Sequence, residues 1–185
     1  MNLWHSVNPA RITPEDFLGI IEISSGSKTK YELDKETGVL ILDRVLHTST
    51  IYPANYGFIP RTYADDNDPL DVLVLCAESI TPLTMVKCYP IGAIIMEDGG
   101  ENDEKIIAIP YGDPRYNCYH DIHDLPDHIS SEMKHFFSVY KALESKQTAV
   151  SEVVGRDEAM GLIQKAIDNY KVKFGQHIVE DDDDL

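Results

Sequence analysis

An acidic segment ahead of an apolar stretch constrains this chain most. Residues 64–71 read Ala-Asp-Asp-Asn-Asp-Pro-Leu-Asp, and four apolar residues follow at once. Carboxylates repel one another and are costly to bury unpaired, so crowding them beside a buried strand usually requires a hard cation. In a fully extended chain Asp66 and Asp71 would lie roughly 16–18 Å apart, too far for one ion with oxygens at about 2.0–2.6 Å. Pro69 predicts a β-turn over residues 68–71, which would gather the carboxylates into a pocket.

The acidic segment has other possible interpretations. An EF-hand calcium loop that began at Asp66 would place Asp71 where that loop requires glycine, so this interpretation fails. If the segment is taken alone, it can also be interpreted as a solvated surface turn. A second acidic cluster, residues 97–104, favours a metal site because it offers Asp98 and Asp103 as further ligands. Two or more Mg²⁺ ions that share carboxylates are used for phosphoryl chemistry.

The composition excludes several classes of function. The net charge of −16 argues against nucleic acid or an anionic membrane as a partner. The longest uncharged apolar stretch, about residues 89–96, is far shorter than the ~20 residues that span a membrane. Three irregularly spaced cysteines give no disulfide framework, and no signal peptide is visible. We therefore expect a soluble, cytoplasmic protein.

Short strands are predicted over the first two thirds of the chain, and helices over the last third. A short helical turn is expected after Thr13. Residues 34–38 read as the loop of a hairpin, and many short strands favour a small barrel or sandwich. Apolar residues at helical spacing predict helices from about 126 to 146 and over 160–174. The expected strands cover residues 20–23, 30–33, 39–42, 71–76, 84–95 and 105–109.

These elements predict a β-barrel-centred α+β fold with two C-terminal helices laid against the barrel. The length of 185 residues and the absence of a visible linker favour one domain. We expect residues 1–179 to form a single catalytic domain. Residues 180–185 end the chain as an acidic run, which we expect to be disordered.

Basic and phenolic side chains form a third group of candidates. Lys30 and Glu32 share one face of a strand, and Arg44 ends the neighbouring hairpin strand. Tyr140 and Lys141 are adjacent on the first predicted helix. Taken one at a time, the tyrosine could be ordinary core packing and the cations could be solvent-exposed.

Two further kinds of site find little support. Cys118, His120 and His123 could form part of a zinc site, but their spacing matches no zinc template. A serine or cysteine nucleophile has no supporting signature such as Gly-x-Ser-x-Gly. Catalysis through a covalent enzyme intermediate is therefore not indicated.

A longer motif gives the chain a resemblance to a known family. Residues 66–72, Asp-Asn-Asp-Pro-Leu-Asp-Val, fit the signature Asp-x-Asp-Pro-x-Asp followed by an apolar residue. Further motifs lie in the same order between about Ile21 and Leu143. They are Lys30-Tyr31-Glu32, Asp43-Arg44, Tyr52-Pro53-x-Asn55-Tyr56-Gly57, Asp98…Asp103-x-Lys105 and His135-Phe136-Phe137…Tyr140-Lys141. In these motifs the chain closely resembles the soluble inorganic pyrophosphatases of family I, of the short bacterial type.

The resemblance implies a fold, an activity and an assembly. The fold would be a five-stranded closed OB-type barrel with flanking helices. The enzyme would be an inorganic diphosphatase that hydrolyses pyrophosphate to two orthophosphates with three or four Mg²⁺ ions. The mechanism would be direct in-line attack by a metal-bridging hydroxide, and the assembly would be a homohexamer.

The resemblance also implies roles for single residues. Asp66, Asp71 and Asp103 would bind the first Mg²⁺, and Asp71 would also hold the second. Asp98 and Asp103 would bind the ion that arrives with substrate, while Glu22 and Glu32 would act mainly through metal-bound waters. Asp68 would be the general base. The phosphates would be held by Lys30, Arg44, Tyr56, Lys105, Tyr140 and Lys141.

Two other functions stay open. A phosphohydrolase acting on nucleoside phosphates or polyphosphate would use the same chemistry, and only a comparison of substrates separates it. A non-catalytic, cation-binding module would have no use for Lys30, Arg44 and Lys141, so their clustering near the carboxylates would argue against it. In a pyrophosphatase or in the broader phosphohydrolase, a chain of charge −16 can bind a polyanionic substrate because metal ions supply positive charge.

Overall fold

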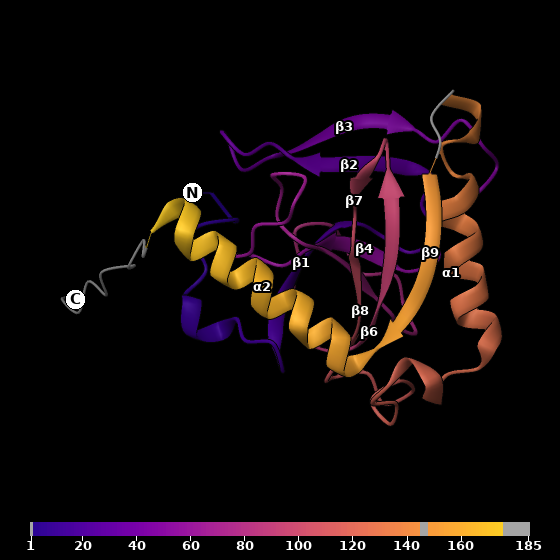
Figure 1. The fold of residues 1–185 in the computed structure, drawn as a ribbon. Coiled ribbons are helices and arrows are strands. Elements are labelled where there is room, and N and C mark those ends of the chain that lie inside the picture. Colours follow the sequence, from indigo (N-terminus) through magenta and orange to yellow (C-terminus); the bar gives the residue numbers. More distant parts are fainter. Residues whose placement is uncertain (1, 145–147, 176–185) are drawn as a thin grey trace.

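The structure, a computed structural model, describes residues 2–144 and 148–175. Within these residues seven strands form one mixed sheet and two further strands form a separate hairpin (Figure 1). The sheet contains β1 (Phe17–Ile23), β4 (Asn55–Phe58), β5 (Asp71–Val74), β6 (Met85–Asp98), β7 (Glu101–Asn102), β8 (Lys105–Pro110) and β9 (Thr148–Gly155). The hairpin contains β2 (Thr29–Leu33) and β3 (Leu40–Val45). The helices are α1 (Asp127–Val139), α2 (Arg156–Phe174) and 3₁₀ turns at Pro9–Arg11, Ile122–Asp124 and Ala142–Glu144.

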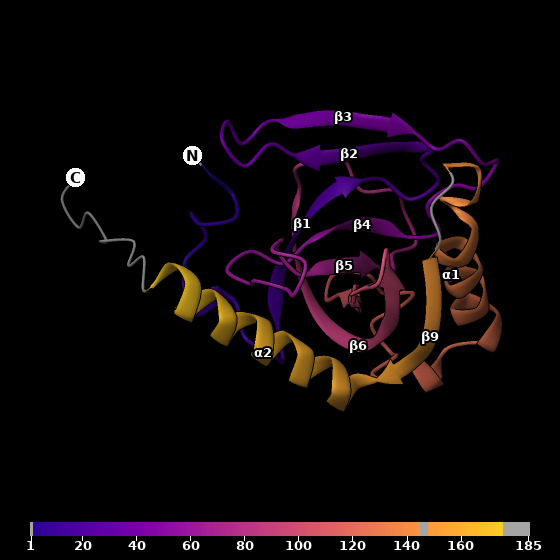
Figure 2. The ribbon, with the colours of Figure 1, turned by 45° about the horizontal axis from the view of Figure 1, so that its top comes forward.

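Five strands of the sheet are paired in a ring. The order is β1, β4, β5, β8 and β6, and β6 pairs again with β1. Only β5 and β8 run parallel among the strand pairs of the described residues. Figure 2 shows β1, β4 and β5 side by side above the strongly curved β6. The 14-residue length of β6 makes this possible, because its first residues pair with β1 and its later ones with β8 and β9.

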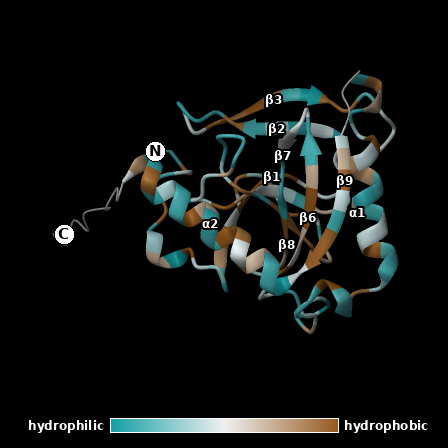
Figure 3. Ribbon diagram, viewed as in Figure 1, coloured by the Kyte–Doolittle hydropathy of each residue, from teal (hydrophilic) through white to brown (hydrophobic). Residues whose placement is uncertain are grey.

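Apolar side chains on the two faces of the strands enter two separate clusters. Every residue of β1 and of β8 is buried. In β5, Val72 and Val74 belong to the cluster that also contains residues of α2, while Leu73 belongs to the cluster that contains residues of α1. Because side chains alternate along a strand, the next residue toward the start of β5, Asp71, shares the face of Leu73. Figure 3 shows hydrophobic and hydrophilic residues alternating along the outer helix α2.

Gly57 is required by the close approach of β4 to β1. A Cβ atom at this position would lie 1.8 Å from the carbonyl oxygen of Ile20. No side chain fits at that distance, so the residue must be glycine for the two strands to pair. This pairing positions Tyr56, the neighbour of Gly57, beside the candidate site.

The sequence-based elements differ from the structure in several places. β4 and β9 were not predicted, and the residues after Thr13 form a bend rather than a helical turn. The first helix ends at Val139 instead of near residue 146, and the second begins earlier, at Arg156. The predicted acidic tail, residues 180–185, lies outside the described residues. In the part of the chain that the structure describes, no helix is long and apolar enough to cross a membrane.

Candidate active site

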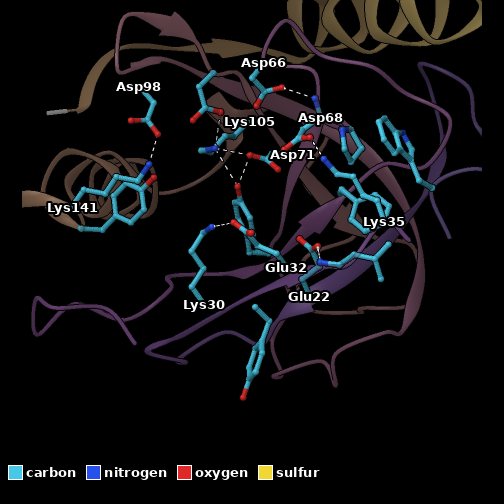
Figure 4. A pocket seen from close by; sticks show the side chains of 18 residues that line it. Glu22, Lys30, Glu32, Lys35, Asp66, Asp68, Asp71, Asp98, Lys105 and Lys141 are labelled. Carbon is cyan, nitrogen blue, oxygen red and sulfur yellow. Dashed lines mark hydrogen bonds and ion pairs between the residues drawn. The ribbon is translucent and has the colours of Figure 1, made fainter. Parts of the chain in front are cut away.

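One pocket brings the predicted site residues together (Figure 4). Every predicted site residue except Arg44 lines it, although the residues come from distant parts of the chain. The strands contribute Glu22 from β1, Lys30 and Glu32 from β2, Tyr56 from β4, Asp71 from β5, Asp98 from β6 and Lys105 from β8. The connections contribute Asp66, Asp68, Asp103, Tyr140 and Lys141.

Lys105 lies at the centre of the pocket, opposite Asp71 in the parallel pair of strands. Its side chain is only 2% exposed and donates to Asp71 Oδ2 at 2.7 Å and to Asp103 Oδ1 at 2.8 Å. The hydroxyl of Tyr56 donates to the same Asp71 oxygen. Burial alone would lower the pKa of Lys105, but the charges of Asp71 and Asp103 outweigh it and hold that pKa well above its usual value. Lys105 therefore keeps its positive charge in the buried centre.

The acidic segment bends at a different place from the one predicted. The turn spans residues 64–67, closed by the amide of Asn67 donating to the carbonyl of Ala64 at 3.2 Å, and not residues 68–71. Asn67 has a φ of 70°, a left-handed conformation that asparagine tolerates. The side chain of Asp66 accepts from the amide of Asp68 at 3.0 Å, which closes the bend further. Pro69 and Leu70 instead lead from the bend into β5. The expected gathering of carboxylates is nevertheless present.

Three carboxyl groups of the pocket hold their protons more tightly than usual. Burial raises the pKa of Glu22 to about 8 and that of Asp66 to about 6. Burial also raises the pKa of Asp103. The charge of Asp71 adds to the effect of burial at each of the three. The pocket therefore favours binding of positive charge.

The donor set of the pocket fits hard divalent cations. Its ligand atoms are carboxylate oxygens, which are the preferred ligands of Mg²⁺. Among the described residues, however, no three His, Cys, Asp or Glu side chains stand close enough together to hold a metal ion as they are. Lysine side chains form ion pairs with the carboxylates instead, as in Lys105–Asp71 and Lys141–Asp98. A metal ion could bind only if these ammonium groups moved away from the carboxylate oxygens.

The remaining cations differ in how they meet the pocket. Lys30 donates to Asp43 at 3.0 Å and also pairs with Glu32. Burial would lower the pKa of Lys30, but these carboxylates raise it. Arg44 pairs with the same Asp43 and donates to Glu144 at 2.9 Å, and it does not line the pocket. In this structure two carboxylates outside the pocket hold the guanidinium of Arg44, and its role as a phosphate ligand stays a prediction.

Lys35 and Trp4 line the pocket but were not predicted as site residues. Lys35 pairs with Asp68, although the two residues are 33 positions apart. The sequence identified Lys35 only as part of a hairpin loop. That the loop reaches the acidic segment depends on how the β2–β3 hairpin lies on the sheet, and no local pattern reports this.

The cysteine and histidines of the loop at residues 118–123 are all exposed. Cys118 and His120 are exposed, and His123 Nδ1 lies 2.5 Å from Asp121 Oδ1. Within residues 2–144 and 148–175 no group of metal-ligating side chains includes them.

Carboxylates and lysines meeting in one pocket on a mixed sheet have the chemistry of a site for a polyanion and hard cations. A family model described as inorganic pyrophosphatase matches residues 19–171, and the chain belongs to that family. A soluble inorganic pyrophosphatase of Solanum tuberosum is 47% identical over 167 residues, which are 90% of this chain and 79% of the relative. A soluble inorganic pyrophosphatase of Chlamydomonas reinhardtii is 44% identical over 92% of this chain and 89% of the relative.

Solved structures of the same family have the same fold. The inorganic pyrophosphatase of Thermus thermophilus superposes with a TM-score of 0.89 at 38% identity, covering 92% of this chain and 99% of that chain. The inorganic pyrophosphatase of Helicobacter pylori gives a TM-score of 0.83 at 42% identity, covering 85% of this chain and 95% of that chain. The resemblance found in the sequence motifs is thus confirmed.

Proposed function

We propose that this protein catalyses the Mg²⁺-dependent hydrolysis of inorganic pyrophosphate to two orthophosphates. By its family the chain is an inorganic diphosphatase, a hydrolase of phosphoanhydrides. The observation that carries the proposal is the single pocket in which the carboxylates meet Lys30, Lys105 and Lys141. A non-catalytic cation-binding module would have no use for these ammonium groups.

The carboxylates are proposed to hold the metal ions. Asp66, Asp71 and Asp103 would bind one Mg²⁺, with Asp71 shared by a second. Asp98 and Asp103 would hold an ion that enters with substrate, giving three or four ions in all. Glu22 and Glu32 would act through waters. When bound, these ions would lower the pKa of a shared water and offset the charge of the phosphates.

Asp68 is the proposed general base for direct in-line attack of water on phosphorus. Its side chain is 53% exposed and lines the pocket, and its partner among the described side chains is Lys35. A carboxylate that is not needed as a metal ligand can accept the proton that the attacking water loses. No side chain of the protein would form a covalent bond to phosphorus.

The phosphate groups are proposed to bind the cationic and phenolic side chains of the pocket. Such groups, fixed before the reaction, stabilise charge that develops on the leaving phosphate. Tyr140 is buried and stacks on Phe136 at a centroid distance of 5.2 Å, which fixes its ring. Arg44 would have to leave Glu144 to take part. The proposed phosphate ligands are Lys30, Arg44, Tyr56, Lys105, Tyr140 and Lys141.

Three further proposals concern the whole protein. The pairing of β6 with β1 supports a closed five-stranded barrel of the OB type. Residues 1–179 would act as one catalytic domain, and the assembly would be a homohexamer in the cytoplasm. Sedimentation analysis tests the assembly, since a monomer would contradict it.

Phosphate release from several substrates tests the proposed function. Pyrophosphate, tripolyphosphate and ATP are compared with Mg²⁺ and with EDTA. We expect rapid release from pyrophosphate with Mg²⁺, much slower release from the two longer substrates, and no release in EDTA. Preferred turnover of ATP or tripolyphosphate would replace the proposal with a broader phosphohydrolase, and undiminished activity in EDTA would contradict the metal dependence.

A further inference from the structure

Lys35 is a cation of the pocket that the roles above do not use. We propose that Lys35 binds a phosphate group of the substrate and that the N-terminal residues Asn2 and Trp4 hold it in position. The inference rests on the proposed function, because it assigns a further substrate ligand to the same site.

The ammonium group of Lys35 is available to a ligand. It lines the pocket, and its one carboxylate partner among the described residues is Asp68. The two side chains are 46% and 53% exposed, and ion pairs in such surroundings contribute little to stability. An incoming phosphate oxygen can therefore replace Asp68 as the partner of Lys35 at small cost.

Lys35 also adds positive charge where the pocket otherwise has little. Figure 4 shows Lys35 beside Asp68, on the side of the pocket opposite Lys141. Lys105, at the centre, is already bonded to both Asp71 and Asp103. A pyrophosphate has two phosphate groups, so a cation on each side can contact both ends of one substrate.

Two residues of the N-terminal segment contact Lys35. The ammonium nitrogen lies 5.3 Å from the centroid of the Trp4 ring, and Asn2 Nδ2 donates to the carbonyl of Lys35 at 2.6 Å. A cation over an aromatic face is attracted by the ring quadrupole. The side chain of a flexible lysine is thereby directed toward the pocket.

Trp4 is itself firmly placed. Its side chain is buried, and its Nε1 donates to the carbonyl of Thr62 at 2.8 Å. The ring stacks on His5 at 4.7 Å and meets Phe174 of α2 edge-on at 5.3 Å. The contact to Lys35 is thus part of a packed aromatic cluster, which lowers the entropy that the lysine would lose on binding.

Binding of imidodiphosphate, a pyrophosphate analogue, with Mg²⁺ tests the inference by calorimetry, alongside kcat and KM for pyrophosphate. Lys35→Met removes the charge at similar size, Lys35→Arg keeps it, and Lys28→Met is the control, because Lys28 is exposed and outside the pocket. A charged hydrogen bond of ordinary strength predicts a loss of about 10- to 100-fold in analogue affinity and in kcat/KM for Lys35→Met. Lys35→Arg should recover part of the loss, and Lys28→Met should match the wild type.

Trp4 provides a second readout, because it is the single tryptophan of the chain. Its fluorescence should change when a phosphate group of the analogue binds the ammonium group beside the indole ring, and Lys35→Met should abolish that change. Trp4→Leu should lower the affinity for the analogue by about two- to fivefold, the range expected for an exposed cation–π contact. Asn2→Ala tests the same support through the carbonyl of Lys35 if Trp4→Leu does not fold.

Clear results would overturn the inference. If Lys35→Met binds the analogue within about twofold of the wild type, Lys35 only balances the charge of Asp68. Undiminished affinity in Trp4→Leu or Asn2→Ala would overturn the supporting role of the N-terminal segment. A wild-type protein that does not hydrolyse pyrophosphate would instead refute the proposed function, so the two failures are distinguishable.

Discussion

Replacing Glu22 by Gln should change how the stability of the protein depends on pH. Glu22 lies on β1, is almost fully buried, and accepts from the amide of Leu33 at 2.7 Å. Burial raises the pKa of this carboxyl from 4.5 to about 8 in the folded chain. Between these two values the folded state binds the proton more tightly than the unfolded state does. The stability that the proton provides is therefore complete below pH 4.5 and is lost as the pH rises toward about 8.

The size of the effect follows from the pKa difference. At about 1.36 kcal/mol per pH unit, the interval from 4.5 to about 8 corresponds to an upper limit of about 5 kcal/mol. Glutamine has nearly the same shape and can accept the same bond from Leu33, but it does not ionise. The variant should therefore resemble the wild type at low pH and become the more stable of the two as the pH rises.

Urea denaturation in EDTA, at pH values from about 5 to about 9, measures this difference. The free energy of unfolding of Glu22→Gln minus that of the wild type should grow by several kcal/mol across the range. Glu132→Gln is the matched control, because Glu132 is exposed on α1, and its difference should stay flat. A flat difference for Glu22→Gln as well would refute the reasoning that burial holds the proton on this carboxyl.

Other predictions concern the metal ions, the base and the central lysine. Mg²⁺ should raise the melting temperature, by the equivalent of about 2.7 kcal/mol at 100 times its Kd. The shift should be larger at pH 8 than at pH 6, because Asp66, with a pKa of about 6, must lose its proton before it binds the ion. Equal shifts at both pH values in calorimetric scans would contradict this. Asp68→Asn should cut turnover while Mg²⁺ affinity stays nearly intact. Lost metal binding with normal turnover at saturating Mg²⁺ would rule out Asp68 as the general base. Lys105→Met should cost about 3–5 kcal/mol in EDTA, because Asp71 and Asp103 lose their buried partner; a urea midpoint equal to that of the wild type would show that the lysine is not required for stability.

Strands and helices with a clear period were predictable from the sequence, and those defined by a distant partner were not. β8 and α2 carry uninterrupted apolar or helical patterns, so their presence follows from local chemistry. β4 is four residues long and contains glycine, and its strand conformation is fixed by pairing with β1 and β5. The residues of β9 are partly exposed and partly half-buried, without a regular alternation, and the strand is held along one edge by β6. Local patterns do not contain the information that decides these two strands.

The candidate site shows the same division. The acidic segment and its signature predicted that Asp66 and Asp71 would meet in one pocket, and both line it. The position of the bend was wrong, since the Asp66 side chain and the left-handed Asn67 stabilise a turn that the proline rule does not anticipate. Lys35 was missed because its contact with Asp68 joins two loops that only the packed fold brings together.

Phosphate release across a Mg²⁺ titration, with Asp71→Asn beside Asp65→Asn, tests whether the pocket hydrolyses pyrophosphate through metal ions. Asp71 is bonded within the pocket, whereas Asp65 lies outside it and accepts from Lys165 at 2.8 Å. The two variants remove the same charge from the same acidic segment. We predict that Asp65→Asn keeps the wild-type rate and Mg²⁺ dependence, while Asp71→Asn loses activity and needs far more Mg²⁺. Equal rates and equal Mg²⁺ dependence in the two variants would contradict this.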